Sequence, residues 1–203
     1  MAALFGIDAA MGDVVRTSSD PMIGQIRLAW WRERLEELDQ GKGAPAEPRL
    51  QAVSNDLIPG GVSGRDAAAL EGGWLKLFTP FPWDISVVEA LWFRGRLLFG
   101  LSAKLLGGTN DRIEAAGGLW AVTDVARRCS DPQSRSLLIR EAGTLARGQG
   151  GTKIDSSLRP LSMLTAVAIR DLAKGEPLER EGSPARAAAM LRHRLFGKLP
   201  RLG

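Results

Sequence analysis

The segment from Asp20 to Leu38 combines a clear helix start with the absence of a polar face. Asp20 can accept hydrogen bonds from the free N–H groups of a first turn, and Pro21 suits the first helical position. Apolar residues then form two stripes at helical spacing, rotated from each other about the axis. They are Ile23, Ile26 and Trp30 in one stripe, and Leu28, Trp31, Leu35 and Leu38 in the other. Because a helix that is apolar on two sides packs between other elements, we predict a central helix over 21–40 with Ile26, Trp30 and Trp31 buried.

Two arginines, Arg27 and Arg32, lie among these apolar residues. A guanidinium that is buried without a partner is strongly unfavourable, so each needs an anionic partner or a route to water. One interpretation is an internal ion pair, or an arginine whose aliphatic stem packs while its head reaches solvent. The other interpretation is a pocket that binds an anion or a substrate.

Further helix starts recur along the chain. Asp131-Pro132 and Ser183-Pro184 each pair a capping residue with a proline, and Ser86 with Glu89 has the spacing of a capping box. Ser63 with Asp66 is a weaker version. The apolar spacing between these signals is helical, whereas hairpin turns and strand-like alternation are missing, so we predict an all-α protein. The expected helices cover residues 2–16, 21–40, 47–57, 64–77, 86–107, 110–129, 132–147, 158–174 and 184–196.

Length and composition fit an ordinary globular protein. The chain has 203 residues, of which 44% are apolar and 25% charged, which is consistent with a single domain over 1–203. No apolar run approaches the roughly 18 residues of a membrane-spanning helix, and the N-terminus lacks the pattern of a signal peptide. We therefore expect a cytoplasmic protein whose contact with a membrane, if it has one, is peripheral.

Cys129 and His193 are the only cysteine and histidine of the chain. An intrachain disulfide is therefore excluded, and Cys/His sites for zinc or iron have too few ligands. His193 lies far from any nucleophile motif, and we expect it on the surface.

The C-terminal segment 180–203 is strongly basic. Glu181 is its one acidic residue, whereas its basic residues are Arg180, Arg186, Arg192, Arg194, Lys198 and Arg201. Met190, Leu191, Leu195 and Phe196 are interleaved with them. Residues 184–203 could therefore lie on anionic lipid or on an acidic protein partner. The alternative is a solvated final helix. No recognised nucleic-acid-binding motif accompanies the charge, so we expect no nucleic-acid partner.

Several segments carry a resemblance to a known family. They are Pro21-Met22-Ile23-Gly24, Arg27-Leu28, Trp30-Trp31-Arg32, the run from Gly117 to Arg127, Leu158-Arg159-Pro160-Leu161 and Arg170-Asp171-Leu172. Together, and in this order, they resemble the squalene/phytoene synthase family. The resemblance implies an all-helical, isoprenoid-synthase-like bundle around a deep apolar cavity, here in a shortened form.

Active members of that family condense two prenyl diphosphates head to head. Two aspartate-rich motifs hold Mg²⁺, which in turn holds the diphosphates, because hard cations prefer oxygen ligands and stabilise the departing charge. Here the first motif falls at residues 12–16, where Asp13 is retained but Gly12 and Arg16 replace the outer aspartates. In the second, Asp124 stands where the family commonly has Asn, and Arg128 replaces an aspartate. We call these two segments the first and second motif remnants.

The degenerate motifs resemble those of the divergent branch that includes complex I assembly factors, whose members are thought to act without prenyl-transfer chemistry. Three functions follow. The first is a non-catalytic protein that binds a protein partner, a lipid or an isoprenoid, without metal or cofactor. The second is an active prenyltransferase, which alone would require Mg²⁺. The third is a metal-free binder of diphosphate or phospholipid, in which an arginine cluster supplies the countercharge. Its candidate residues are Arg16, Arg27, Arg127 and Arg128.

Overall fold

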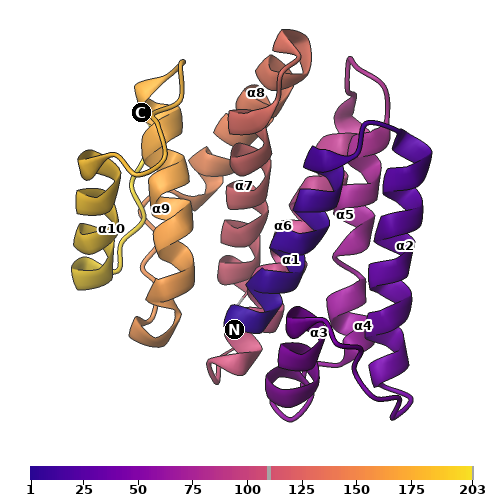
Figure 1. The fold of residues 1–203 in the computed structure, drawn as a ribbon. Coiled ribbons are helices and arrows are strands. Elements are labelled where there is room, and N and C mark those ends of the chain that lie inside the picture. Colours follow the sequence, from indigo (N-terminus) through magenta and orange to yellow (C-terminus); the bar gives the residue numbers. More distant parts are fainter. Residues whose placement is uncertain (109–110, 203) are drawn as a thin grey trace. The chain divides into compact units, whose positions relative to one another are not determined.

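The computed structural model describes residues 1–108 and 111–202, and the chain divides into two compact units. Unit 1 is Met1–Pro80 and unit 2 is Phe81–Gly203. Within the described ranges the regular structure is helical, and the one exception is an isolated bridge between Lys153 and Lys198 (Figure 1). The all-α prediction is confirmed.

Unit 1 is built on two antiparallel helices joined by a short loop, α1 (Ala2–Thr17) and α2 (Pro21–Leu38) (Figure 1). Shorter helical segments follow and pack against this pair. They are α3 (Pro48–Ala52), the π-helical η1 (Val53–Leu57), α4 (Gly64–Ala68), α5 (Glu71–Leu75) and the 3-10 turn η2 (Lys76–Phe78). The helices expected over 47–57 and 64–77 are therefore each interrupted. The Asp39 carboxylate accepts hydrogen bonds from the N–H groups of Gly64 and Arg65 and fixes the start of α4 at the predicted position.

Helix α2 begins as expected, because Asp20 Oδ1 accepts hydrogen bonds from the N–H groups of Met22 and Ile23. Its second apolar stripe is buried, and Trp31 with it, as predicted. The burial predicted for Ile26 and Trp30 is wrong, since 60% and 41% of their surfaces are exposed. Within unit 1, α2 packs against α1, α4, α5 and η2, and these elements cover one of the two stripes.

Unit 2 is organised around α7 (Asp111–Arg128), which packs against three other helices. These are α6 (Ile85–Leu105), α8 (Pro132–Gln149) and α9 (Arg159–Lys174). The closest packing is between α6 and α7, where a Cβ atom added to Gly95 would lie 2.2 Å from the carbonyl oxygen of Gly117. Only glycine fits at such a crossing, so Gly117, which lies in one of the segments carrying the resemblance, has a packing role.

The helix boundaries in unit 2 agree with the predicted ranges to within about two residues. Asp131 and Ser183 cap α8 and α10 (Pro184–Phe196) as expected. The cap predicted at Ser86 is wrong, because the Asp84 carboxylate accepts from the Ser86 N–H and the helix starts at Ile85.

The expectation of a surface position for His193 is also wrong. Its side chain lies in the interface between α10 and α9, with Nε2 2.7 Å from Ser162 Oγ and Nδ1 3.2 Å from the carbonyl oxygen of Lys198. A carbonyl can only accept, so Nδ1 carries the proton and Nε2 accepts from the serine hydroxyl. Burial lowers the pKa of His193 below its ordinary value of 6.5.

No helix in the described parts of the chain combines the length and the hydropathy that crossing a membrane requires.

Candidate functional site

The first motif remnant lies on the exposed side of α1. Asp13 and Arg16 are one turn apart, and Arg16 Nη2 donates to Asp13 Oδ1 at 3.0 Å. Both side chains are more than half exposed. An exposed ion pair at this spacing contributes a few tenths of a kcal/mol to the free energy of unfolding. Arg16 therefore neutralises the Asp13 carboxylate with little effect on stability.

The indole ring of Trp74 occupies the space beside Gly12, the residue at the first aspartate position of the motif that the resemblance implies. A Cβ atom added to Gly12 would lie 2.8 Å from Cη2 of Trp74, which is shorter than real Cβ contacts allow. Trp74 is held there by a hydrogen bond of 2.9 Å from Nε1 to Asp8 Oδ1. An aspartate at position 12 would therefore require the ring to move.

Arg27 and Arg32, the two arginines of α2 that lie among its apolar residues, have different surroundings. Arg27 Nη1 donates to the hydroxyls of Thr17, at the end of α1, and Ser18, in the loop that follows, at 3.3 and 3.2 Å. Arg32 Nη1 donates to Glu71 Oε2 at 3.3 Å, and its head remains partly exposed. Burial raises the pKa of the Glu71 carboxyl, and the charge of Arg32 opposes that shift. For Arg32, the interpretation as an ion pair with a route to water is confirmed.

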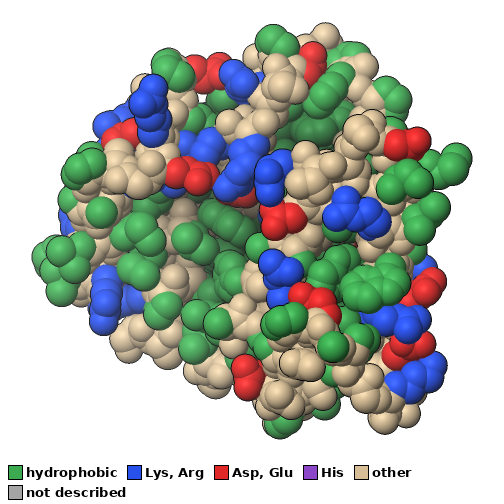
Figure 2. Space-filling view, viewed as in Figure 1, with side chains coloured by type: hydrophobic (Ala, Val, Ile, Leu, Met, Phe, Trp, Pro, Cys, Tyr) green, Lys and Arg blue, Asp and Glu red, His purple; other side chains and the backbone are tan. Residues whose placement is uncertain are grey.

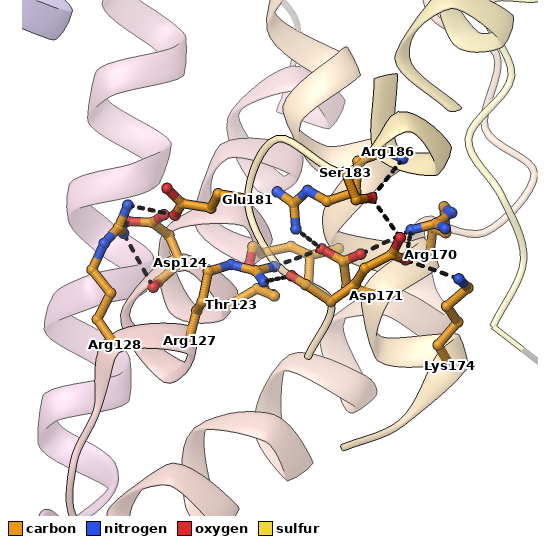
Figure 3. Close-up of polar contacts among 12 residues, drawn as sticks. Thr123, Asp124, Arg127, Arg128, Arg170, Asp171, Lys174, Glu181, Ser183 and Arg186 are labelled. Atoms are coloured by element: carbon orange, nitrogen blue, oxygen red, sulfur yellow. Dashed lines mark hydrogen bonds and ion pairs between the residues drawn. The ribbon is translucent and has the colours of Figure 1, made fainter. Parts of the chain in front are cut away.

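The second motif remnant lies near the C-terminal end of α7. Arg128 contacts the carboxylate of Asp124, one turn earlier, and reaches Glu181 Oε1 at 2.8 Å (Figure 3). Arg128 is half exposed, whereas only 19% of the Asp124 side chain is. As in α1, the aspartate of the segment is paired with an arginine one turn away on the same helix.

Arg127 belongs to a more deeply buried cluster centred on Asp171. Arg127 Nη2 lies 2.5 Å from Asp171 Oδ2, and Arg186 contacts the same oxygen. Arg170 Nη1 lies 3.1 Å from Asp171 Oδ1 (Figure 3). The Asp171 side chain has no exposed surface. Three guanidinium groups thus surround one buried carboxylate. The burial of each of these charges is compensated by the others, so none can be removed without destabilising the rest.

Glu179 extends this cluster. It accepts from Arg170 at 2.6 Å, Lys174 at 2.8 Å and Ser183 at 2.5 Å, and its carbonyl oxygen accepts from Arg127. The hydrogen bonds from Arg170, Lys174 and Ser183 lower the pKa of Glu179 to about 2. We call Arg127, Arg170, Asp171, Lys174, Glu179 and Arg186 the Asp171 network.

A small pocket adjoins the network within unit 2. Its volume is about 50 Å³, and Trp120, Asp124, Arg127 and Met190 are among its lining residues. Pockets that bury small organic ligands measure roughly 300 Å³ or more, so this one has room for ordered water and not for a prenyl chain.

The two remnants do not fit a magnesium site. Among the described residues, no three or more Asp, Glu, His or Cys side chains are grouped so that they could hold a metal ion. Mg²⁺ requires several hard oxygen ligands in octahedral geometry, whereas Asp13 and Asp124 each face an arginine instead. Each of these two carboxylates is thus already paired with a positive charge on its own helix.

The predicted site residues fall into both units. Asp13, Arg16 and Arg27 lie in unit 1, and Asp124, Arg127 and Arg128 in unit 2. Within unit 1, Asp13 contacts Arg16, whereas Arg27 contacts hydroxyls. Within unit 2, Asp124 contacts Arg128, whereas Arg127 belongs to the Asp171 network. That the two remnants together form one arginine cluster stays a prediction.

The sequence reasoning did not identify Asp171, Glu179 or Arg186 as members of a site. Asp171 lies within Arg170-Asp171-Leu172, one of the segments that carry the family resemblance. An acidic residue inside an otherwise apolar helical pattern was the available signal, because such a residue needs a cationic partner when it is buried.

Searches of protein-family models, of curated proteins and of solved structures find no match to this chain.

Proposed function

We propose that this protein is a non-catalytic relative of the squalene/phytoene synthases that acts by binding, without prenyl-transfer chemistry. One observation carries the proposal. In each motif remnant the aspartate that is present, Asp13 or Asp124, is ion-paired with the arginine that stands at a position where the family has an aspartate. A carboxylate engaged in this way is a poor ligand for Mg²⁺, and the adjacent guanidinium repels the cation.

The packing around Gly12 supports the same conclusion. Trp74 fills the space that a side chain at position 12 would need, so unit 1 is folded around the loss of that aspartate. The role of Arg127 is also structural, since it stabilises Asp171 inside unit 2. A binding function does not require metal-binding carboxylates in either remnant, whereas metal-dependent ionisation of a prenyl diphosphate requires them in both.

The test is an assay for release of diphosphate from farnesyl and geranylgeranyl diphosphate, with and without Mg²⁺. We expect no release above the rate in buffer under either condition. Metal-dependent release that is abolished by Asp13→Ala or Asp124→Ala would contradict the proposal and favour the prenyltransferase alternative. The Asp56→Ala variant is a matched control, because Asp56 is an exposed residue of η1 and lies outside both remnants.

The metal-free binder is a second candidate, and Arg27 favours it. Among the described residues, the hydrogen bonds of its guanidinium go to the Thr17 and Ser18 hydroxyls, so its charge is not neutralised by a carboxylate. If this alternative holds, inorganic diphosphate binds without Mg²⁺, and Arg27→Gln weakens that binding. Arg34→Gln is the control on the same helix and leaves binding unchanged, because Arg34 pairs with Glu37 and is not a candidate residue.

A further inference from the structure

Polar contacts on the inner face of α10 fix this helix against the rest of unit 2. Arg186 contacts the buried Asp171, and His193, two turns later, hydrogen-bonds with Ser162. At the end of the helix, Arg159 Nη1 donates to the carbonyl oxygens of Arg194 and Leu195, both at 3.0 Å. These contacts set the rotation of α10 about its axis, and therefore which residues point outward.

The outward face of α10 is apolar to an unusual degree. Leu191, Leu195 and Phe196 are 59%, 63% and 68% exposed. Scattered surface leucines need no explanation, but three large apolar side chains within six positions of one short helix form a contiguous patch. Figure 2 shows hydrophobic side chains next to Lys and Arg at the left edge of the view, where α10 lies in Figure 1.

The charged side chains that α10 and the residues after it carry have one sign. No acidic residue follows Glu181 in the sequence, and the exposed basic residues are Arg192, Arg194, Lys198 and Arg201. For Arg192 and Arg194 no ion pair is found with any described residue of the chain. The outward face therefore combines exposed apolar side chains with uncompensated positive charge.

Helix α2 offers a comparison within the same protein. It also exposes large apolar side chains, Met22, Ile23 and Ile26. However, its three arginines are balanced by three glutamates. Exposed apolar surface thus occurs on two helices, but only that of α10 is accompanied by net positive charge.

We propose that the outward face of α10 binds the surface of an anionic phospholipid bilayer. Leu191, Leu195 and Phe196 enter the headgroup region, and Arg192 and Arg194 contact lipid phosphates. An amphipathic helix with these two kinds of residue interleaved lies in the plane of the interface, held by apolar burial and by attraction to anionic lipid. This surface uses no residue of the motif remnants, so the bilayer contact goes beyond the proposed function and does not depend on it.

The experiment is co-sedimentation of the full chain with vesicles of phosphatidylcholine alone and with matched vesicles that also contain phosphatidylserine. We expect binding only when phosphatidylserine is present, and weaker binding at higher salt. Arg192→Glu/Arg194→Glu and Leu195→Ser/Phe196→Ser should each reduce binding about tenfold or more. Circular dichroism and the melting temperature identify any variant that fails to fold.

The control is Ile23→Ser/Ile26→Ser, which removes two exposed apolar side chains from α2 and should leave vesicle binding unchanged. Equal binding to both vesicle types, or an equal loss in the α2 control, would overturn the proposal. So would the absence of binding to either vesicle, which would favour an acidic protein groove as the partner of this face. Retained binding in both folded α10 variants would overturn it as well.

Discussion

The two motif remnants differ in what surrounds them. In unit 1, Asp13 and Arg16 form an exposed pair on α1, and the neighbouring space is filled by Trp74. In unit 2, Asp124 and Arg128 lie beside a buried network in which Asp171 holds Arg127, Arg170 and Arg186. An aspartate–arginine pair is thus peripheral to the packing in unit 1 and adjoins a buried cluster of charges in unit 2.

The difference in burial predicts how much each group of charges contributes to stability. An exposed ion pair contributes little, and its residues can be exchanged with small effects. A buried ion cluster cannot be dismantled one residue at a time, because removing one partner leaves the others buried and unpaired. The following predictions test this contrast, from the largest expected effect to the smallest.

Asp171→Asn should destabilise the protein most. The amide keeps the shape of the side chain but leaves Arg127 and Arg186 without their anionic partner in a buried setting, at a cost of about 3–5 kcal/mol in the free energy of unfolding. The measurement is chemical denaturation, with Asp13→Asn as the control, for which we expect less than about 1 kcal/mol. Equal losses in the two variants would contradict the contrast between the units.

Gly12→Ala tests whether Trp74 closes the first remnant. The added methyl group would meet the ring at 2.8 Å, so we expect a loss of about 1–3 kcal/mol from overpacking. Gly6→Ala is the matched control on the same helix, because nothing lies within 4 Å of its Cβ position. It should stabilise the protein by about 0.5–1 kcal/mol, as expected for alanine in place of glycine within a helix. A stabilised Gly12→Ala variant would show that Trp74 moves aside easily.

His193 should make the stability of unit 2 depend on pH. Burial lowers the pKa of the folded-state imidazole below 6.5, so the unfolded chain binds a proton more readily. Stability is therefore present above about pH 6.5 and falls as the pH decreases below it, by at most about 1.4 kcal/mol per pH unit. Denaturation at about pH 7.5 and pH 5.5 measures this, and His193→Gln should reduce the difference. If the stability of His193→Gln differs between the two pH values as much as that of the unmodified protein, the pH dependence comes from other titratable groups.

Arg128→Asp should have the smallest effect, because Arg128 is half exposed. The new carboxylate would lie beside Asp124 and Glu181, and we expect a loss of about 1 kcal/mol in the free energy of unfolding from the lost ion pairs and the added repulsion. Arg16→Asp is the corresponding change on α1 and should cost about half as much. A loss as large as that of Asp171→Asn would place Arg128 inside the buried network.

Local signals in the sequence predicted most of the fold. Asp20-Pro21, Asp131-Pro132 and Ser183-Pro184 act within one turn, and each marks a helix start in the structure. The exposure of Ile26 and Trp30 could not be predicted in this way. Both stripes of α2 are equally apolar, and which one is buried depends on where α1, α4 and α5 lie.

The distinction between local signals and long-range packing also applies to the candidate site. The pairs Asp13–Arg16 and Asp124–Arg128 have the three- and four-residue spacings of neighbours on a helix, so they can be read from the sequence. The contact of Arg127 with Asp171 spans 44 positions, and that of Trp74 with Asp8 spans 66. Such contacts follow from tertiary packing, and no local pattern specifies them.

The most direct test of the account is a calorimetric titration of the full chain with inorganic diphosphate, performed with and without Mg²⁺. If arginines have replaced the metal ligands in both remnants, Mg²⁺ does not strengthen diphosphate binding, and the two titrations give the same result. Binding that is tightened at least about tenfold by Mg²⁺, and that loses this dependence in Asp13→Ala or Asp124→Ala, would contradict the account.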